Sequence, residues 1–136
     1  MRLWHHDLIP FLPRSQLLAQ WRELNSIFAK EDRHILINYI YDYPRSDLFA
    51  YTELVIQEMG LRGYNIRSFE KMNAYFLQAE KHPTHEPFIH HHNDDYLEIC
   101  YFNLKEKFIR GQKDFSEEQF KLLHQFYELK MKKRSR

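Results

Sequence analysis

An adjacent arginine and glutamate, Arg22 and Glu23, lie on the polar side of a predicted amphipathic helix. With Trp21 at the centre of the apolar stripe and about 100° per residue, Glu23 falls on the far side of that helix. Most such pairs belong to a solvated charged surface. A carboxylate beside an arginine and beneath an N-terminal segment can instead form a catalytic site that moves protons. The choice between the two interpretations depends on the neighbouring sequence.

Histidines are the second group of residues whose side chains could take part in chemistry. Imidazoles bind zinc, nickel and copper, and three of them with an open coordination position could activate water. The chain has no H-E-x-x-H pattern, and the expected ligands fall in a segment broken by prolines, so we expect no metal and no cofactor. The alternative is a polar loop beside DNA, with imidazoles that become charged below about pH 6.5. The crowded histidines are His82, His85, His90, His91 and His92.

Composition excludes several other chemistries. The three glycines, which are Gly60, Gly63 and Gly111, are too widely spaced for a Walker phosphate loop or a dinucleotide-binding fingerprint. The lone Cys100 forbids an internal disulfide and falls on an apolar stripe, where we expect it in the core. Twenty Lys and Arg against nineteen Asp and Glu give a net charge of +1. Any nucleic-acid site must therefore be a local basic patch.

The spacing of apolar residues predicts an all-α fold of about four to five helices. Asn93 is expected to cap one helix, and Ser116 with Gln119 to form a capping box at the start of the last. Residues 35–43 are rich in Ile and Tyr and could form a strand or an extended connector. The predicted helices cover about 13–29, 46–62, 69–80, 93–110 and 116–131.

A length of 136 residues predicts a single domain over 1–136, with 116–136 forming a C-terminal helix and the basic tail KKRSR. No apolar run approaches the roughly 20 residues that cross a bilayer, and the start MRLWHHDLIP does not resemble a signal peptide. A single cysteine suits a reducing compartment. We therefore expect a cytoplasmic protein without a membrane partner.

Three strings in order carry a resemblance to a known family. They are LLAQWREL at 17–24 with Arg33 and His34 downstream, LRGYNI at 61–66, and NLKEKF at 103–108. Over about residues 1–110 the chain resembles the phage endonuclease V family of pyrimidine dimer DNA glycosylases. The resemblance implies an all-α DNA-repair enzyme that acts on damaged double-stranded DNA. It implies cleavage of the glycosidic bond followed by an abasic-site (AP) lyase step, without a cofactor.

The resemblance also assigns roles to residues. In that family the nucleophile is the α-amine of the mature N-terminus, and the key carboxylate belongs to the pair that matches Arg22 and Glu23. Glu23 is then the catalytic acid and Arg22 a ligand of phosphate or sugar. Arg2 matches an arginine next to the N-terminus. Because the long side chain of Arg2 disfavours removal of the initiator methionine, we expect Met1 to remain and to supply the amine.

An α-amine suits this chemistry because its unperturbed pKa is about 7.7 to 8.0, against about 10.4 for lysine. Attack at the sugar C1′ expels the base and leaves an imine, which acts as an electron sink for removal of the adjacent sugar proton. A nearby carboxylate can stabilise the oxocarbenium-like charge and assist proton transfer. His5 and His6 lie beside the proposed nucleophile and could act as proton shuttles, or serve a structural role.

The chain also departs from the family pattern. Gln16 and Ser26 stand where the family has a histidine and an arginine, and the C-terminus lacks the family's aromatic tail. The resemblance therefore specifies the lyase chemistry more closely than the lesion. Phosphate contacts should be strongly salt-dependent. The expected DNA-binding residues are Arg2, Arg14, Arg22, Arg33, His34, Lys105 and Lys107.

Two functions of other classes remain open at this point. The same fold could serve as a noncatalytic module that binds nucleic acid or protein, and this alternative predicts an N-terminus that is buried, acetylated or remote from Glu23. A metallohydrolase built on the histidine-rich loop would instead bind metal stoichiometrically and lose activity to chelators.

Overall fold

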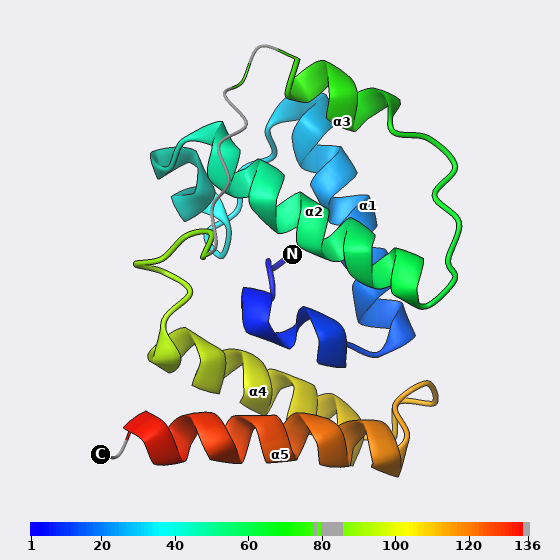
Figure 1. The fold of residues 1–136 in the computed structure, drawn as a ribbon, viewed down its shortest axis with the longest axis vertical. Helices are drawn as coiled ribbons and strands as arrows, with labels where there is room; N and C mark the ends of the chain where they lie inside the picture. The colour runs from blue at the N-terminus through cyan, green and yellow to red at the C-terminus, as the bar shows by residue number, and fades with distance from the viewer. Residues whose placement is uncertain (78, 80–85, 135–136) are drawn as a thin grey trace.

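The structure is a computed structural model that describes residues 1–77, 79 and 86–134. Those residues form helices and turns and contain no strand, which confirms the predicted all-α fold (Figure 1). Within the same ranges, no helix is both long and apolar enough to cross a membrane. The elements in chain order are η1 (His6–Phe11), α1 (Arg14–Lys30), η2 (Asn38–Asp42), α2 (Arg45–Leu61), α3 (Glu70–Tyr75), α4 (Asp94–Ile109) and α5 (Glu117–Arg134).

The helices pack in two groups around the N-terminal segment. Helix α1 contacts both α2 and α3, while α4 and α5 lie side by side at the other end of the molecule (Figure 1). The η1 turn joins the two groups, because it contacts α2, α4 and α5. Leu3, Leu8 and Ile9 are accordingly among the most buried side chains of the core. The first residues of the chain are therefore held on several sides.

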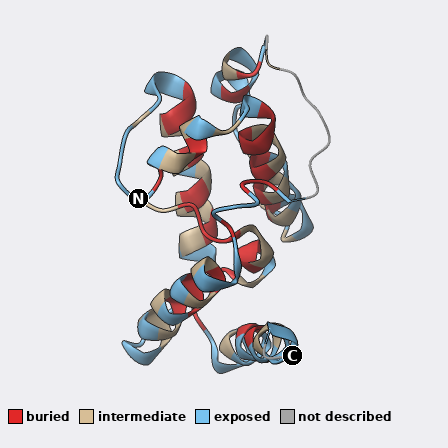
Figure 2. Ribbon diagram, turned by 90° about the vertical axis from the view of Figure 1, so that its left-hand side faces the viewer, coloured by how far each residue is buried: buried red, intermediate tan, exposed pale blue. Residues whose placement is uncertain are grey.

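Apolar spacing explains which face each helix buries (Figure 2). In α1, Leu17, Leu24, Ile27 and Phe28 are buried and recur at helical intervals. In α4, Leu97, Cys100, Tyr101 and Leu104 are buried on one stripe, so the prediction that Cys100 belongs to the core is confirmed.

The predicted starts of the last two helices are also confirmed. Asn93 caps α4, since its side chain accepts a hydrogen bond from the Tyr96 N–H. Ser116 and Gln119 exchange two backbone-to-side-chain hydrogen bonds at the start of α5, as a capping box requires. Each cap satisfies backbone N–H groups that the first helical turn leaves unpaired.

The strand or extended connector expected at 35–43 is wrong. Residues 35–37 form a turn and η2 follows. Ile37 and Ile40, three positions apart, are both buried, which suits a 3₁₀ turn, whereas a strand would point their side chains to opposite faces. The helix predicted over 69–80 is shorter, Glu70–Tyr75, since Phe76 leaves helical geometry. Gln78, Glu80, His82, His85 and the final residues 135–136 lie outside the described residues.

Candidate active site

Glu23 lies half-buried on α1, next to the N-terminal segment. Its Oε2 accepts a hydrogen bond of 3.1 Å from the Nε2 of Gln20, one helical turn earlier. The same Nε2 donates to the carbonyl oxygen of Arg2, also at 3.1 Å. One amide group thus links the carboxylate of Glu23 to the second residue of the chain. This environment differs from the solvated helix surface that a polar face alone would predict.

Gln20 is fully buried, and all of its hydrogen-bonding groups are used. Its Oε1 accepts from the backbone N–H of Trp4 at 2.9 Å and from the hydroxyl of Tyr51 at 2.8 Å. With two donors and two acceptors engaged, the amide has one fixed orientation. We missed this residue in the sequence. A signal was present, because Gln20 occupies a stripe position between Leu17 and Leu24, where a polar side chain needs buried partners.

Opposing influences act on the Glu23 carboxyl. Burial raises its pKa, whereas the positive charge of the N-terminal amine, the Arg2 backbone N–H and the Arg22 side chain all lower it, and the net pKa is raised. The N-terminal amine therefore lies within electrostatic reach of Glu23. A carboxyl whose pKa moves toward neutrality is better suited to donate and accept protons near pH 7.

Replacing Gln20 by leucine should destabilise the protein, because the Trp4 N–H and the Arg2 carbonyl lose buried partners. We expect the free energy of unfolding to fall by at least about 1 to 3 kcal/mol, the usual cost of one unpaired buried polar group. Urea denaturation of Gln20→Leu measures this change. Gln57→Leu, at an exposed position of α2, is the matched control. An equal loss in both variants would contradict the role of Gln20.

A groove of about 1040 Å³ runs along α1 beside this site. Trp21 lines it and meets Phe69 edge-on, with ring centroids 6.0 Å apart. Glu70 is the one acidic residue among its lining, so positive charge dominates. The basic residues of the groove are Arg22, Lys30, Arg67 and Lys71. We predicted only Arg22 from the sequence, although Arg67 and Lys71 follow the LRGYNI string closely.

The predicted DNA ligands nearest the N-terminus differ in exposure. Arg22 is exposed on the rim of the groove, next to Glu23. Arg2 is half-buried, and its guanidinium lies over the Tyr96 ring at 5.8 Å from the centroid. Arg22 is therefore available to a phosphate, whereas Arg2 is partly engaged with α4.

Three other predicted ligands lie near the two ends of α1. Arg14 is exposed at its start and lies over Tyr64, 5.4 Å from the ring centroid. Arg33 is exposed beyond its end and lies over Tyr41 at 3.9 Å. His34 is also exposed, and its Nδ1 accepts a hydrogen bond from the Leu36 N–H. His34 therefore stabilises the turn that follows α1.

Lys105 and Lys107 lie on α4, away from the group that contains Glu23 (Figure 1). Two positions along an α-helix correspond to about 200°, so the two side chains leave nearly opposite sides of α4. Lys105 lies over Phe102 at 5.8 Å from the ring centroid. The structure therefore does not bring these two lysines together on one surface.

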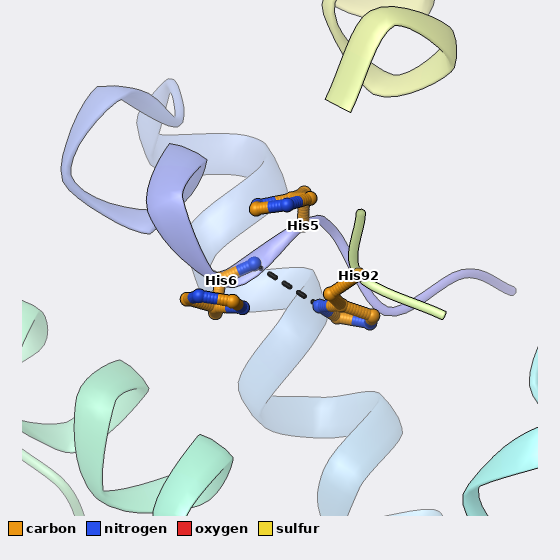
Figure 3. A group of neighbouring side chains, drawn as sticks. All are labelled: His5, His6 and His92. Carbon is orange, nitrogen blue, oxygen red and sulfur yellow. Dashed lines mark hydrogen bonds between the residues drawn. The ribbon is translucent and has the colours of Figure 1, made fainter. Parts of the chain in front are cut away.

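The two N-terminal histidines are packed into the protein (Figure 3). His5 is 3% exposed and stacks on His6, with ring centroids 4.6 Å apart. Burial lowers the pKa of His5 to about 4 and lowers that of His6 as well. His5 is thus neutral near pH 7 and can accept a proton only weakly, which favours the structural role over the proton shuttle.

The described histidines of the predicted loop, His90, His91 and His92, occupy consecutive positions of one turn but differ in burial. His92 is buried beside His5 and His6, while His90 and His91 are exposed. The hydroxyl oxygen of Tyr43 lies 2.7 Å from the Nδ1 of His91. The described histidines of this segment are therefore divided between the core and the surface.

Residues 1–72 match the family model described as pyrimidine dimer DNA glycosylase. No curated protein and no solved structure matches the chain. The matched residues include Glu23, Gln20 and all four basic residues of the groove, whereas α4 and α5 lie beyond them. Because the match covers more than half of the chain, this protein belongs to the pyrimidine dimer DNA glycosylase family.

Proposed function

We propose that this protein is a DNA glycosylase with associated AP lyase activity, and that it acts on UV-type pyrimidine dimers in double-stranded DNA. The α-amine of Met1 is the nucleophile and Glu23 is the catalytic carboxylate. Family membership supports the glycosylase class. The network around Gln20 supports the mechanism, because it holds the first residues of the chain against Glu23.

The reaction follows from these two groups. The neutral amine forms a bond to C1′ of the sugar, and the glycosidic bond breaks as the base leaves with its electron pair. The Glu23 carboxylate stabilises the positive charge that develops at the sugar. The nitrogen then gives one proton to the departing base, and the C1′–O4′ bond breaks with a proton from water going to O4′, so the ring opens to a protonated imine. Glu23 assists removal of a C2′ proton, and β-elimination expels the 3′ phosphate.

We also assign the basic groove as the phosphate-binding surface. Phosphate contacts release counterions, so each one adds roughly 0.9 to the salt slope of binding to duplex DNA. Arg14 at the start of α1 and Arg33 beyond its end are exposed and lie outside the lining of the groove, and we propose them as further phosphate contacts. The η1 turn packs against α2, α4 and α5, and on this basis we treat residues 1–136 as one domain.

Removing single groove charges should weaken DNA binding uniformly across sequences. We expect Arg67→Ala and Lys71→Ala each to reduce the slope of log K against log salt by about 1. Fluorescence anisotropy with a duplex over a series of salt concentrations measures the slope. Lys121→Ala on α5, at the other end of the molecule, is the control (Figure 1). Equal slopes in all three variants would exclude the groove from the DNA interface.

Cleavage of three otherwise identical duplexes tests the proposed function. One duplex carries a single cyclobutane pyrimidine dimer, the second an abasic site, and the third no damage. We expect cleavage of the first two duplexes and none of the third, without added metal. Cleavage of the abasic duplex alone would retain the lyase but remove the proposed lesion. Binding without any cleavage would favour the noncatalytic module.

A further inference from the structure

Two adjacent histidines of the N-terminal segment and a third from the turn before α4 come together in the fold. They are His5, His6 and His92, and each offers one ring nitrogen within 4.8 Å of the others (Figure 3). His5 and His92 are buried, and the side chain of His6 is only 10% exposed. Buried polar side chains normally have hydrogen-bond partners, so the surroundings of each nitrogen matter.

One nitrogen of the cluster has no such partner. The Nδ1 of His6 is buried without a hydrogen bond among the described residues. Its other nitrogen, Nε2, lies 3.3 Å from the Oδ1 of Asp7. With the proton on Nε2 and directed at Asp7, Nδ1 retains its lone pair. A carboxylate that orients a histidine in this way is the usual outer partner of a metal-bound imidazole.

His92 presents a second lone pair. Its Nε2 lies 2.6 Å from the Tyr39 hydroxyl, and its Nδ1 accepts a hydrogen bond from the His6 backbone N–H at 3.2 Å. This hydrogen bond from the His6 N–H is at the long end of the range for N–H donors, so a metal ion can replace it as the partner of the His92 Nδ1. The His6 and His92 rings lie 5.6 Å apart and nearly parallel. His5 stacks on His6 and adds the third imidazole to the cluster.

We propose that His5, His6 and His92 form a binding site for a divalent transition metal, with zinc as the expected ion. Imidazole nitrogens suit zinc, and three of them leave a fourth position for water. Zinc–nitrogen bonds of about 2.0 to 2.1 Å bring ligand nitrogens to about 3.4 Å from one another. Binding therefore rotates the rings toward a common centre. The site is independent of the proposed reaction, since no step of the imine chemistry uses a metal.

The charges around the cluster set its expected affinity. The carboxylate of Asp7 favours a cation, but the Nζ of Lys130, from α5, lies 3.4 Å from the Asp7 Oδ2 and opposes it. A surface depression of about 170 Å³ borders His6 and offers a route for the ion. Removing Lys130 should tighten zinc binding, whereas Asp7→Asn should weaken it by about 10 to 100-fold, as loss of an outer-shell partner usually does.

Zinc titration of the untagged, chelator-treated protein at pH 7 tests the site. We expect isothermal titration calorimetry to give one zinc ion per chain. His92→Ala should lower the affinity for zinc by more than about tenfold, because it removes a direct ligand. Loss of an outer-shell partner alone usually lowers metal affinity by about 10 to 100-fold. His90→Ala, at an exposed position of the turn before α4, is the control and should leave binding unchanged.

Imidazole nitrogen NMR of the wild-type protein identifies the ligands without any substitution, so it decides the result even where His92→Ala does not fold. The proposal predicts zinc-dependent shifts of ring nitrogens in His5, His6 and His92. Absence of zinc binding, or shifts confined to the exposed His90 and His91, would overturn it. Because no DNA is present, these outcomes are distinct from failure of the glycosylase assay.

Discussion

Replacing Glu23 by glutamine should lower the rate of strand cleavage at an abasic site by about 10² to 10⁴-fold, the usual contribution of a positioned general acid or base. Glutamine keeps the size of the side chain and can still accept the hydrogen bond from Gln20, but it cannot exchange a proton or stabilise positive charge at the sugar. Single-turnover cleavage of a duplex that carries one abasic site measures this effect. Glu53→Gln, at an exposed position on α2, should retain the wild-type rate.

The same variant should not be less stable than the wild type at pH 7. Burial raises the pKa of Glu23 in the folded protein, so the native state holds this proton more tightly than the unfolded chain does. Stability therefore falls as pH rises from the unfolded pKa to the folded pKa, and the loss persists above that range. Glutamine removes this cost. A melting temperature well below that of the wild type, or full activity, would contradict the role assigned to Glu23.

Extending the N-terminus should also cause a large loss of strand cleavage. Two residues, Gly-Ser, placed before Met1 displace the free amine by several ångströms, since each residue adds up to about 3.6 Å. A misplacement of about 1 Å can already cost about 10²-fold, so we expect at least this loss of strand cleavage. The measurement is single-turnover cleavage of the abasic duplex by the extended protein.

The matched control carries Gly-Ser after Arg136, at the other end of the chain. It should cleave at the wild-type rate. Both extended proteins should bind the abasic duplex with similar affinity, because the groove along α1 is unchanged. Full cleavage by the N-terminally extended protein would assign the nucleophile to another amine, such as a lysine of the groove.

The sequence predicted those features that depend on local periodicity and capping. The positions of α1, α2, α4 and α5 follow from apolar residues at helical spacing, and the Ser116–Gln119 box marks the start of α5. Local patterns failed where tertiary contacts decide the conformation. Residues 35–43 contain β-formers, yet burial of Ile37 and Ile40 in the core stabilises a 3₁₀ turn there.

The candidate site was predictable only in part. The Arg22 and Glu23 pair was found through its resemblance to a family. The hydrogen bonds of Gln20, in contrast, reach Trp4 and Arg2, which are 16 and 18 positions away in the sequence. The histidine cluster is a stronger example, because His6 and His92 are 86 positions apart. Grouping histidines by sequence proximity placed His92 with its loop neighbours. Only the fold brings it to His5 and His6.

Borohydride trapping distinguishes an N-terminal nucleophile from any other, because it captures the imine itself. Untagged protein with a free N-terminus is incubated with an abasic duplex and sodium borohydride, and the protein–DNA adduct is digested and mapped by mass spectrometry. We expect a covalent adduct on the peptide that contains Met1, with the DNA attached to the α-amine. An adduct on a lysine side chain, or none under conditions where the abasic strand is cleaved, would contradict it.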